Sequence, residues 1–163
     1  MTIRKGGLAD VNAIVTLEQT LFPRDCPISR RSLARFVHSP TAKIIVAEDA
    51  GQLAGCAIIL FRCRSAIARV YTIGVVPSHR GRGIGSKLLQ AAERGAVARH
   101  CAFIHLEVRR GNKRAIRLYR ARGYRKFGRH ANYYADGADA LRLEKRLALR
   151  SKPLRRTSAT RNG

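Results

Sequence analysis

Three glycines at alternate positions, Gly81, Gly83 and Gly85, follow an apolar strand-like run and precede a helical pattern. Glycine has no Cβ, so the backbone at these positions can approach a ligand closely. The first N–H groups of a helix carry partial positive charge and have no partner within the helix. Arg80 and Arg82 add two full charges to the same stretch. These residue types in this order predict an anion site, and a pyrophosphate would fit it.

Two other glycine-rich phosphate sites are excluded by their spacing. The Rossmann fingerprint G-x-G-x-x-G would need a glycine where Leu88 stands. The P-loop pattern G-x-x-x-x-G-K-[ST] needs a glycine before its lysine, whereas Ser86 precedes Lys87. A turn that only connects a strand to a helix remains the structural alternative. The arginines and the helix that follows favour the anion site.

Glu107 and Tyr119 are the candidates for proton transfer. Glu107 stands between Leu106 and Val108, in an apolar run where a carboxylate is costly unless it is paired or used. Tyr119 shares a helical face with Ile116, and its phenol could donate a proton. On the residues alone, Glu107 could equally lie at a solvated strand edge or pair with an arginine. Tyr119 could equally be a packed core residue.

The elements that would position these residues follow from hydrophobic periodicity. Helices are predicted over 8–21, 29–37, 84–99 and 112–122. Strands are predicted over 2–5, 43–49, 53–61, 66–76, 101–108, 124–129 and 140–147. The order β-α-α-β-β-β-α-β-α-β-β predicts an α/β fold with a mixed sheet.

Local signals predict where several of these elements begin and end. Ser29 and Asn112 are expected N-caps, Gly123 an expected C-terminal stop, and Asp-Ala-Gly-Gln between the second and third strands an expected hairpin turn. Residues 1–147 are expected to form one domain. The basic, aperiodic segment 148–163 is expected to be a disordered tail.

The charge balance is the most unusual property of the composition. The chain has 33 lysines and arginines against 10 acidic residues, which gives a formal net charge of +23 and an isoelectric point near 11.5. Such a balance favours polyanions such as RNA, DNA, anionic lipid or phosphorylated cofactors, although most of the cations could simply be solvated. Weak RNA contact through the basic surface and the tail is therefore an expectation.

The cysteines and the apolar runs predict an ordinary protein of a reducing compartment. Cys26, Cys56, Cys63 and Cys101 show no C-x-x-C spacing, and three of the four lie in apolar runs, so buried thiols are expected rather than a disulfide frame or a metal site. No signal peptide is visible and no apolar run is long enough to cross a bilayer. The expected location is cytoplasmic, without a membrane partner.

At residues 75–89 the pattern V-x-P-x-x-R-G-x-G-x-G-x-x-L-L resembles the acetyl-CoA motif of the Gcn5-related N-acetyltransferases, the GNAT superfamily. LEVRRGNKRAIRLYRARGY at 106–124 and NYYADGADAL at 132–141 resemble the RimI-type bacterial ribosomal-protein-alanine N-acetyltransferases. The glycine motif alone marks the superfamily, and the combined set is more specific. The resemblance implies a GNAT-type mixed central sheet of about seven strands flanked by about four helices, with acetyl-CoA as the acetyl donor and no metal.

The resemblance also implies roles for individual residues. Glu107 would be the proton acceptor and Tyr119 the proton donor. The cofactor would be held by the backbone of Ile73, Gly74 and Val75, by the pyrophosphate-binding stretch Arg80, Gly81, Arg82, Gly83, Ile84, Gly85 and Ser86, and by Asn112. The candidate substrate residues are Glu18, Tyr133 and Tyr134. Glu18 could anchor a substrate ammonium, or could simply belong to the polar face of its helix.

Two features depart from the family pattern: the loop FPRDCPIS contains no tryptophan, and the basic tail has no counterpart. Both lie where a protein substrate could bind. The expected function is acetyl transfer to the N-terminal α-amine of a protein or peptide, with ribosomal proteins among the candidates. Deprotonating an α-amine at pH 7 costs roughly 1 kcal/mol, against about 4–5 kcal/mol for lysine. The alternatives are a small amine or aminoacyl-tRNA acceptor, or a nucleic-acid-binding module with a vestigial acetyl-CoA fold.

Overall fold

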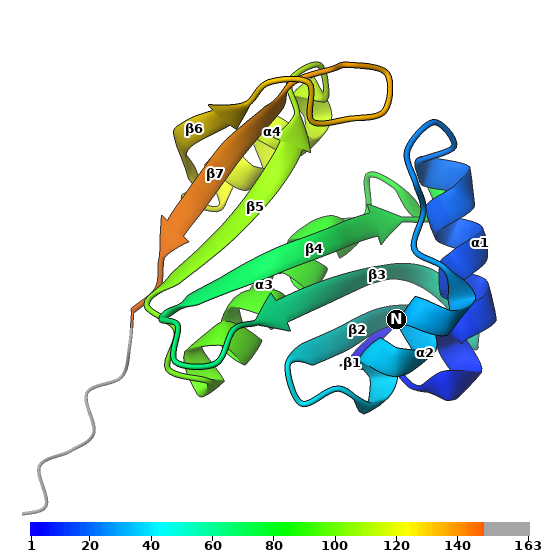
Figure 1. Ribbon diagram of the computed structural model, residues 1–163. Helices are drawn as coiled ribbons and strands as arrows, with labels where there is room; N and C mark the ends of the chain where they lie inside the picture. The colour runs from blue at the N-terminus through cyan, green and yellow to red at the C-terminus, as the bar shows by residue number, and fades with distance from the viewer. Residues whose placement is uncertain (149–163) are drawn as a thin grey trace, which may run out of the picture.

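A seven-stranded mixed sheet organises residues 1–148, the part of the chain that the computed structural model describes (Figure 1). Its strand order is β1-β2-β3-β4-β5-β7-β6. The strands are β1 (Thr2–Lys5), β2 (Ala42–Asp49), β3 (Gln52–Phe61), β4 (Ile67–Val75), β5 (Phe103–Arg109), β6 (Arg125–His130) and β7 (Ala140–Arg146). The helices are α1 (Val11–Leu21), α2 (Arg30–His38), α3 (Ile84–Ala98) and α4 (Lys113–Ala121), with 3-10 turns at Leu8–Asp10 and Pro77–His79. The expected tail falls outside the described residues except for its first position.

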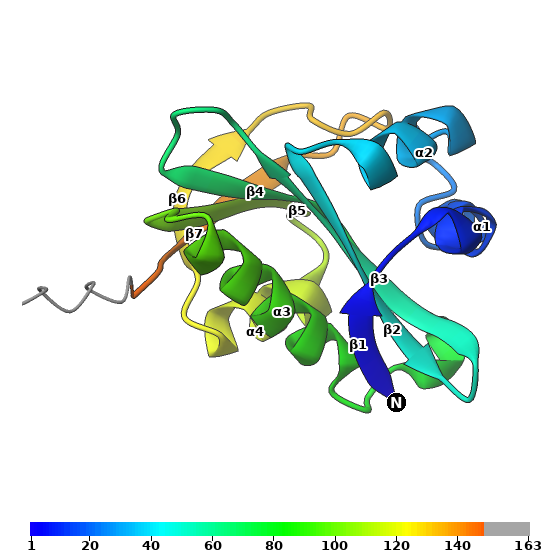
Figure 2. The same cartoon turned by 90° about the horizontal axis from the view of Figure 1, so that it is seen from below.

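The helices cover the sheet from two sides. Figure 2 shows α1 and α2 on one face and α3 and α4 on the other. One buried cluster lies between the sheet and α3 and α4, and a second lies beneath α1 and α2. The predicted α/β class with a mixed sheet of seven strands and four helices is therefore confirmed.

Most of the predicted element boundaries agree with the structure because the signals are local. The side chains of Ser29 and Asn112 each accept a hydrogen bond, at 3.1 Å, from the backbone N–H three residues further on. Gly123 follows α4 with φ +90°. The β2–β3 hairpin turns through Ala50 and Gly51, with φ values of +50° and +76°, as a two-residue turn requires.

The expectation of three buried thiols is wrong. Cys56 and Cys101 are buried, whereas Cys26 and Cys63 are exposed. Cys63 lies just beyond the end of β3, where the chain leaves the sheet and turns towards β4. Within residues 1–148, no helix has the length and apolar character needed to span a membrane, and no group of three metal-ligating side chains was found.

Candidate active site

The site is built around a gap between two parallel strands. β4 and β5 pair only over Ile67–Val70 and Phe103–Leu106. Beyond these residues the strands separate, and Figure 1 shows them diverging towards α1 and the β6–β7 loop. Backbone groups that leave a ladder need other partners, so the edges of the gap are able to hydrogen-bond a bound chain. A cavity of about 880 Å³ occupies this region.

A β-bulge in β4 decides which side chains face the cavity. Two consecutive residues of β3 pair with Val70 and Thr72, so Tyr71 lies between them without a cross-strand partner. As a result Tyr71 and Thr72 both lie towards α1 and α2. The Thr72 hydroxyl donates to Glu18 Oε1 at 2.7 Å, and the Tyr71 ring packs edge-on against Phe36 at 5.8 Å between centroids. No signal in the sequence separates this strand from a regular one.

The glycine stretch has the backbone that a phosphate cradle needs. Gly81 and Gly83 have φ values of +78° and +73°, and a Cβ built on either would meet no heavy atom within 4 Å. Gly83 is the residue before α3, so the helix N-terminus opens beside this empty space. Gly85 has another reason to be glycine, because a Cβ there would lie 3.2 Å from the Leu118 side chain. Ile84 packs in the core, which leaves only its backbone for a ligand. These residues fit a pyrophosphate such as that of acetyl-CoA.

The remaining predicted cofactor residues divide into two groups. Ile73–Val75, Arg80 and Asn112 line the cavity, whereas the stretch 81–86 adjoins it without being part of its lining. Arg82 pairs with Asp49 Oδ2 at 3.0 Å and points its charge at the β2–β3 hairpin. Arg80 has no carboxylate partner within residues 1–148, so its charge remains available to an anion.

Glu107 lines the cavity and is also paired with an arginine. Its Oε2 accepts a hydrogen bond from Arg69 Nε at 3.0 Å, and its side chain is 11% exposed. Arg69 also donates from Nη2 to the Tyr133 hydroxyl at 2.8 Å. Glu107 Oε1 has no hydrogen-bond partner among the residues that the structure describes. The ion pair with Arg69 therefore orients the Glu107 carboxylate and leaves its Oε1 for a ligand.

Tyr119 belongs to the core and to the cavity at once. It is 5% exposed, packs in the cluster beneath α4, and lines the cavity. Its hydroxyl makes no hydrogen bond to any of residues 1–148. Burial raises the pKa of Tyr119 far above its ordinary value, so the phenol keeps its proton at neutral pH.

Glu18 is not a residue of a solvated helix face. It is 4% exposed and lines the cavity from α1. Burial raises the pKa of Glu18, and the hydrogen bond from Thr72 partly offsets that rise. Asp25, Glu107 and Asp136 line the same cavity, so four of the ten acidic residues of this basic chain meet there. The sequence offered no reason to expect this local concentration of carboxylates.

The two candidate tyrosines of the β6–β7 loop are held by arginines that the sequence analysis did not select. Tyr133 is 40% exposed and accepts from Arg69, as described above. Tyr134 lies under the guanidinium of Arg109, 4.2 Å from the ring centroid, and burial raises the pKa of Tyr134 to about 12. One signal could have identified Arg109: it lies two residues after Glu107 in a strand, so the two side chains share a face.

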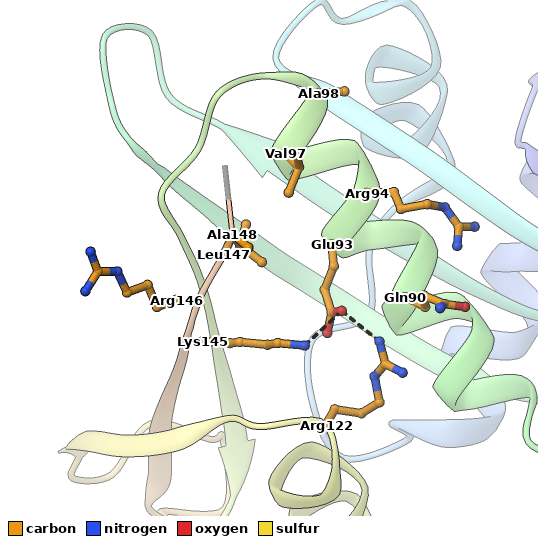
Figure 3. Close-up of a pocket in the computed structure, with 10 residues that line it drawn as sticks. All are labelled: Gln90, Glu93, Arg94, Val97, Ala98, Arg122, Lys145, Arg146, Leu147 and Ala148. Atoms are coloured by element: carbon orange, nitrogen blue, oxygen red, sulfur yellow. Dashed lines mark hydrogen bonds and ion pairs between the residues drawn. The ribbon is translucent and has the colours of Figure 1, made fainter. Parts of the chain in front are cut away.

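A second pocket, of about 550 Å³, lies beside α3 and β7 (Figure 3). Glu93 extends into it and binds Arg122 Nη2 at 2.7 Å and Lys145 Nζ at 3.0 Å. Two cations already neutralise this carboxylate. The cluster therefore joins α3 to β7 and to the end of α4, and we assign it a structural role.

Comparison with known proteins identifies the family of the chain. Residues 11–124 match the family model described as Acetyltransferase (GNAT) family. The chain is 36% identical over 143 residues to N-alpha-acetyltransferase RimI of Mycobacterium tuberculosis, covering 84% of this chain and 87% of that protein. It is 30% identical over 151 residues to an N-alpha-acetyltransferase of Sulfurisphaera tokodaii, covering 85% and 88%. The crystal structure of the ribosomal-protein-S18-alanine N-acetyltransferase from Escherichia coli superposes with a TM-score of 0.78 at 26% identity, covering 94% and 97%. The chain belongs to the GNAT family and is an acetyl-CoA-dependent N-acetyltransferase.

Proposed function

We propose that the protein acetylates the N-terminal α-amine of a protein, with ribosomal proteins as the acceptor class that its relatives suggest. The observation that carries the proposal is the convergence of Glu18, Glu107 and Tyr119 on one cavity from three different elements. The relatives named above act on α-amines, and one of them on a ribosomal protein.

The backbone of Ile73–Val75, the stretch from Arg80 to Ser86 and Asn112 would hold acetyl-CoA, which supplies the acetyl group as an activated thioester. Within this stretch Gly81 and Gly83 have left-handed backbone, and a Cβ built on either would meet no heavy atom within 4 Å. The Asn112 side-chain oxygen caps α4 through the N–H of Ala115, and its amide N–H groups remain available to a ligand.

Protons move between the acceptor and the side chains of the cavity. The acceptor arrives as an ammonium, and Glu107, whose Oε1 has no partner within residues 1–148, takes one proton from it directly or through water. The neutral amine then forms its bond to the acetyl carbon as the carbon–sulfur bond breaks, and the nitrogen releases its second proton to solvent. Tyr119 donates its proton to the departing sulfur and recovers one from solvent.

The energetic preference favours an α-amine over a lysine. Removing a proton at pH 7 costs roughly 1 kcal/mol from an α-amine and about 4–5 kcal/mol from lysine. A single carboxylate is a strong enough base to deprotonate an α-amine, but it is a weak base for deprotonating a lysine.

A pair of matched peptides tests the proposal by mass shift in the presence of acetyl-CoA. One peptide has a free N-terminus and no lysine, and the other has the same sequence with a blocked N-terminus and one lysine. We expect acetylation of the first and little of the second. Polyamines and aminoacyl-tRNA complete the acceptor panel. Preference for the lysine peptide or for either of these acceptors would overturn the assignment.

We also propose that the enzyme contacts RNA through the outer surface of α4 and β6. Nine of the ten acidic residues pair with Arg, Lys or His, and the tenth, Glu18, accepts from Thr72. No carboxylate of residues 1–148 is therefore left to neutralise the exposed cations of this surface, which favours a polyphosphate partner. These cations are Lys113, Arg114, Arg117, Arg120, Arg125 and Lys126.

Charge reversal tests the RNA contact. Changing Arg117, Arg120 and Arg125 to glutamate should weaken binding to single-stranded RNA and lower the slope of log affinity against log salt by about 0.7 for each phosphate that the variant no longer neutralises. The control changes three exposed arginines of α2 in the same way: Arg30, Arg31 and Arg35. An equally weakened affinity in both variants would show that binding follows net charge alone and not this surface.

A further inference from the structure

Arg109 joins two chain segments that are far apart in the sequence. Its Nη1 donates to both carboxylate oxygens of Asp136, at 2.8 and 2.7 Å. Its Nη2 donates to Asp25 Oδ1 at 3.0 Å. The same guanidinium lies over the ring of Tyr134. One side chain at the end of β5 thus holds both the α1–α2 segment and the β6–β7 segment.

Both segments border the cavity. Asp25 belongs to the segment 22–29, and Tyr134 and Asp136 belong to the segment 131–139, and all three line the cavity. Figure 1 shows the two segments at the end of the sheet where β4 and β5 diverge. Arg109 shares the cavity-facing side of β5 with Glu107. The junction between the segments therefore lies close to the proposed base.

Arginine suits this position because it faces two carboxylates. A planar guanidinium can bond both at once through separate N–H groups, which a lysine ammonium on a flexible stem does less well. Without the cation, Asp25 and Asp136 would repel each other across the cavity mouth. The β6–β7 segment is a tight local turn, with Gly137 N–H bonded to the Tyr134 carbonyl at 2.9 Å and Ala138 N–H bonded to Asp136 Oδ1 at 3.1 Å. It should therefore move as a unit when it is released.

We propose that Arg109 is a positioning residue that clamps the two segments over the cavity and thereby sets the KM for the acceptor. The inference rests on the proposed function, because it assumes that the acceptor enters between these segments. The residues proposed for acetyl-CoA lie on β4, the glycine stretch and the start of α4. Removing the clamp should therefore change acceptor binding and leave acetyl-CoA binding nearly unaffected.

Steady-state kinetics of Arg109→Ala and Arg109→Lys test the clamp. We expect Arg109→Ala to raise the acceptor KM by about tenfold, with kcat within about threefold of the parent and an unchanged Kd for acetyl-CoA. Arg109→Lys keeps the positive charge but loses the planar guanidinium, so its acceptor KM should lie between that of the parent and that of Arg109→Ala. Arg110→Ala is the matched control, because Arg110 is the next residue, is exposed, and makes no side-chain hydrogen bond or ion pair within residues 1–148. Its KM should equal that of the parent.

Hydrogen exchange gives a second readout that needs no turnover. Amides of 22–29 and 131–139 should exchange faster in Arg109→Ala than in the parent or Arg110→Ala, and adding Asp136→Ala to Arg109→Ala should change little further. An unchanged acceptor KM, or an equal rise in Arg110→Ala, would overturn the proposal. A parent enzyme that acetylates no α-amine would refute the proposed function alone. In that case, unchanged exchange in Arg109→Ala would still refute the clamp.

Discussion

Replacing Gly83 with valine tests the cradle at the start of α3. Gly83 has φ +73°, a conformation that a β-branched residue adopts at a considerable cost. A Cβ at this position would meet no protein atom within 4 Å. The substitution should therefore strain the backbone locally and fill the space before the helix, without a clash inside the protein.

Two separate magnitudes are expected. Left-handed backbone costs an L residue roughly 1–2 kcal/mol. A change of 1 kcal/mol shifts the midpoint by about 2–4 °C in a chain of this size, so the Tm of the free variant should fall by about 2–8 °C. Acetyl-CoA at about 100 times its Kd should stabilise the parent by about 2.7 kcal/mol, a rise of roughly 5–11 °C. This second shift should be absent in Gly83→Val.

Thermal unfolding with and without acetyl-CoA separates the two effects. Gly123→Val is the control, because Gly123 has φ +90° and a Cβ there would meet only the flexible end of Lys145 at 3.7 Å. It carries comparable backbone strain at the far end of α4. Its free Tm should fall by a similar amount, and the rise caused by acetyl-CoA should be retained.

Two outcomes would refute this reasoning. A full acetyl-CoA shift in Gly83→Val would mean that the glycine stretch does not receive the cofactor. Absence of the shift in Gly123→Val as well would mean that backbone strain anywhere in the fold weakens binding, and the cradle would then have no special role.

Four further variants test the roles assigned to individual side chains. Glu107→Gln should lower turnover by about 10²–10⁴-fold, as measured by steady-state kinetics, while the acetyl-CoA affinity measured by equilibrium binding is retained. Near-normal turnover in this variant would contradict the role of Glu107 as the base. Tyr119→Phe should also slow acetyl transfer, and an unchanged kcat would return Tyr119 to a packing role. Burial raises the pKa of Glu18 in the folded state above the ordinary 4.5. The stability that Glu18 contributes is therefore complete below pH 4.5, and it is lost as the pH rises through the higher pKa of the folded state. Glu18→Gln should therefore unfold at a higher temperature than the parent at pH 7, with the difference vanishing near pH 4, and a lower Tm at pH 7 would refute this. Glu93→Gln should have the opposite effect, a destabilisation of about 1–3 kcal/mol seen as a lower Tm at neutral pH, because it leaves two partly buried cations without their carboxylate; an unchanged Tm would contradict the structural role of this cluster.

Features that depend on a few neighbouring residues could be predicted from the sequence. The N-caps at Ser29 and Asn112 and the turn before β3 are interactions within four residues, so residue type and spacing are sufficient. The glycines of the stretch 81–85 were identified by spacing alone, whereas the left-handed backbone of Gly81 and Gly83, and the helical backbone of Gly85, were decided by the fold. The fold class followed because periodicity reports which face of each element is buried, and the motif over 75–89 indicated the family.

Contacts between distant segments were decided by the tertiary structure. Arg109 and Asp25 are 84 positions apart, and Glu107 and Arg69 are 38 apart, so their contacts depend on strand order and on register. A shift of one residue in a strand reverses the face of every following side chain, and the bulge at Tyr71 is such a shift. The bulge and the divergence of β4 from β5 open the cavity and bring carboxylates from four segments into it. Propensity acts over a few residues, whereas this cavity is set by pairing energies summed over the whole sheet, and for that reason only the folded structure contains it.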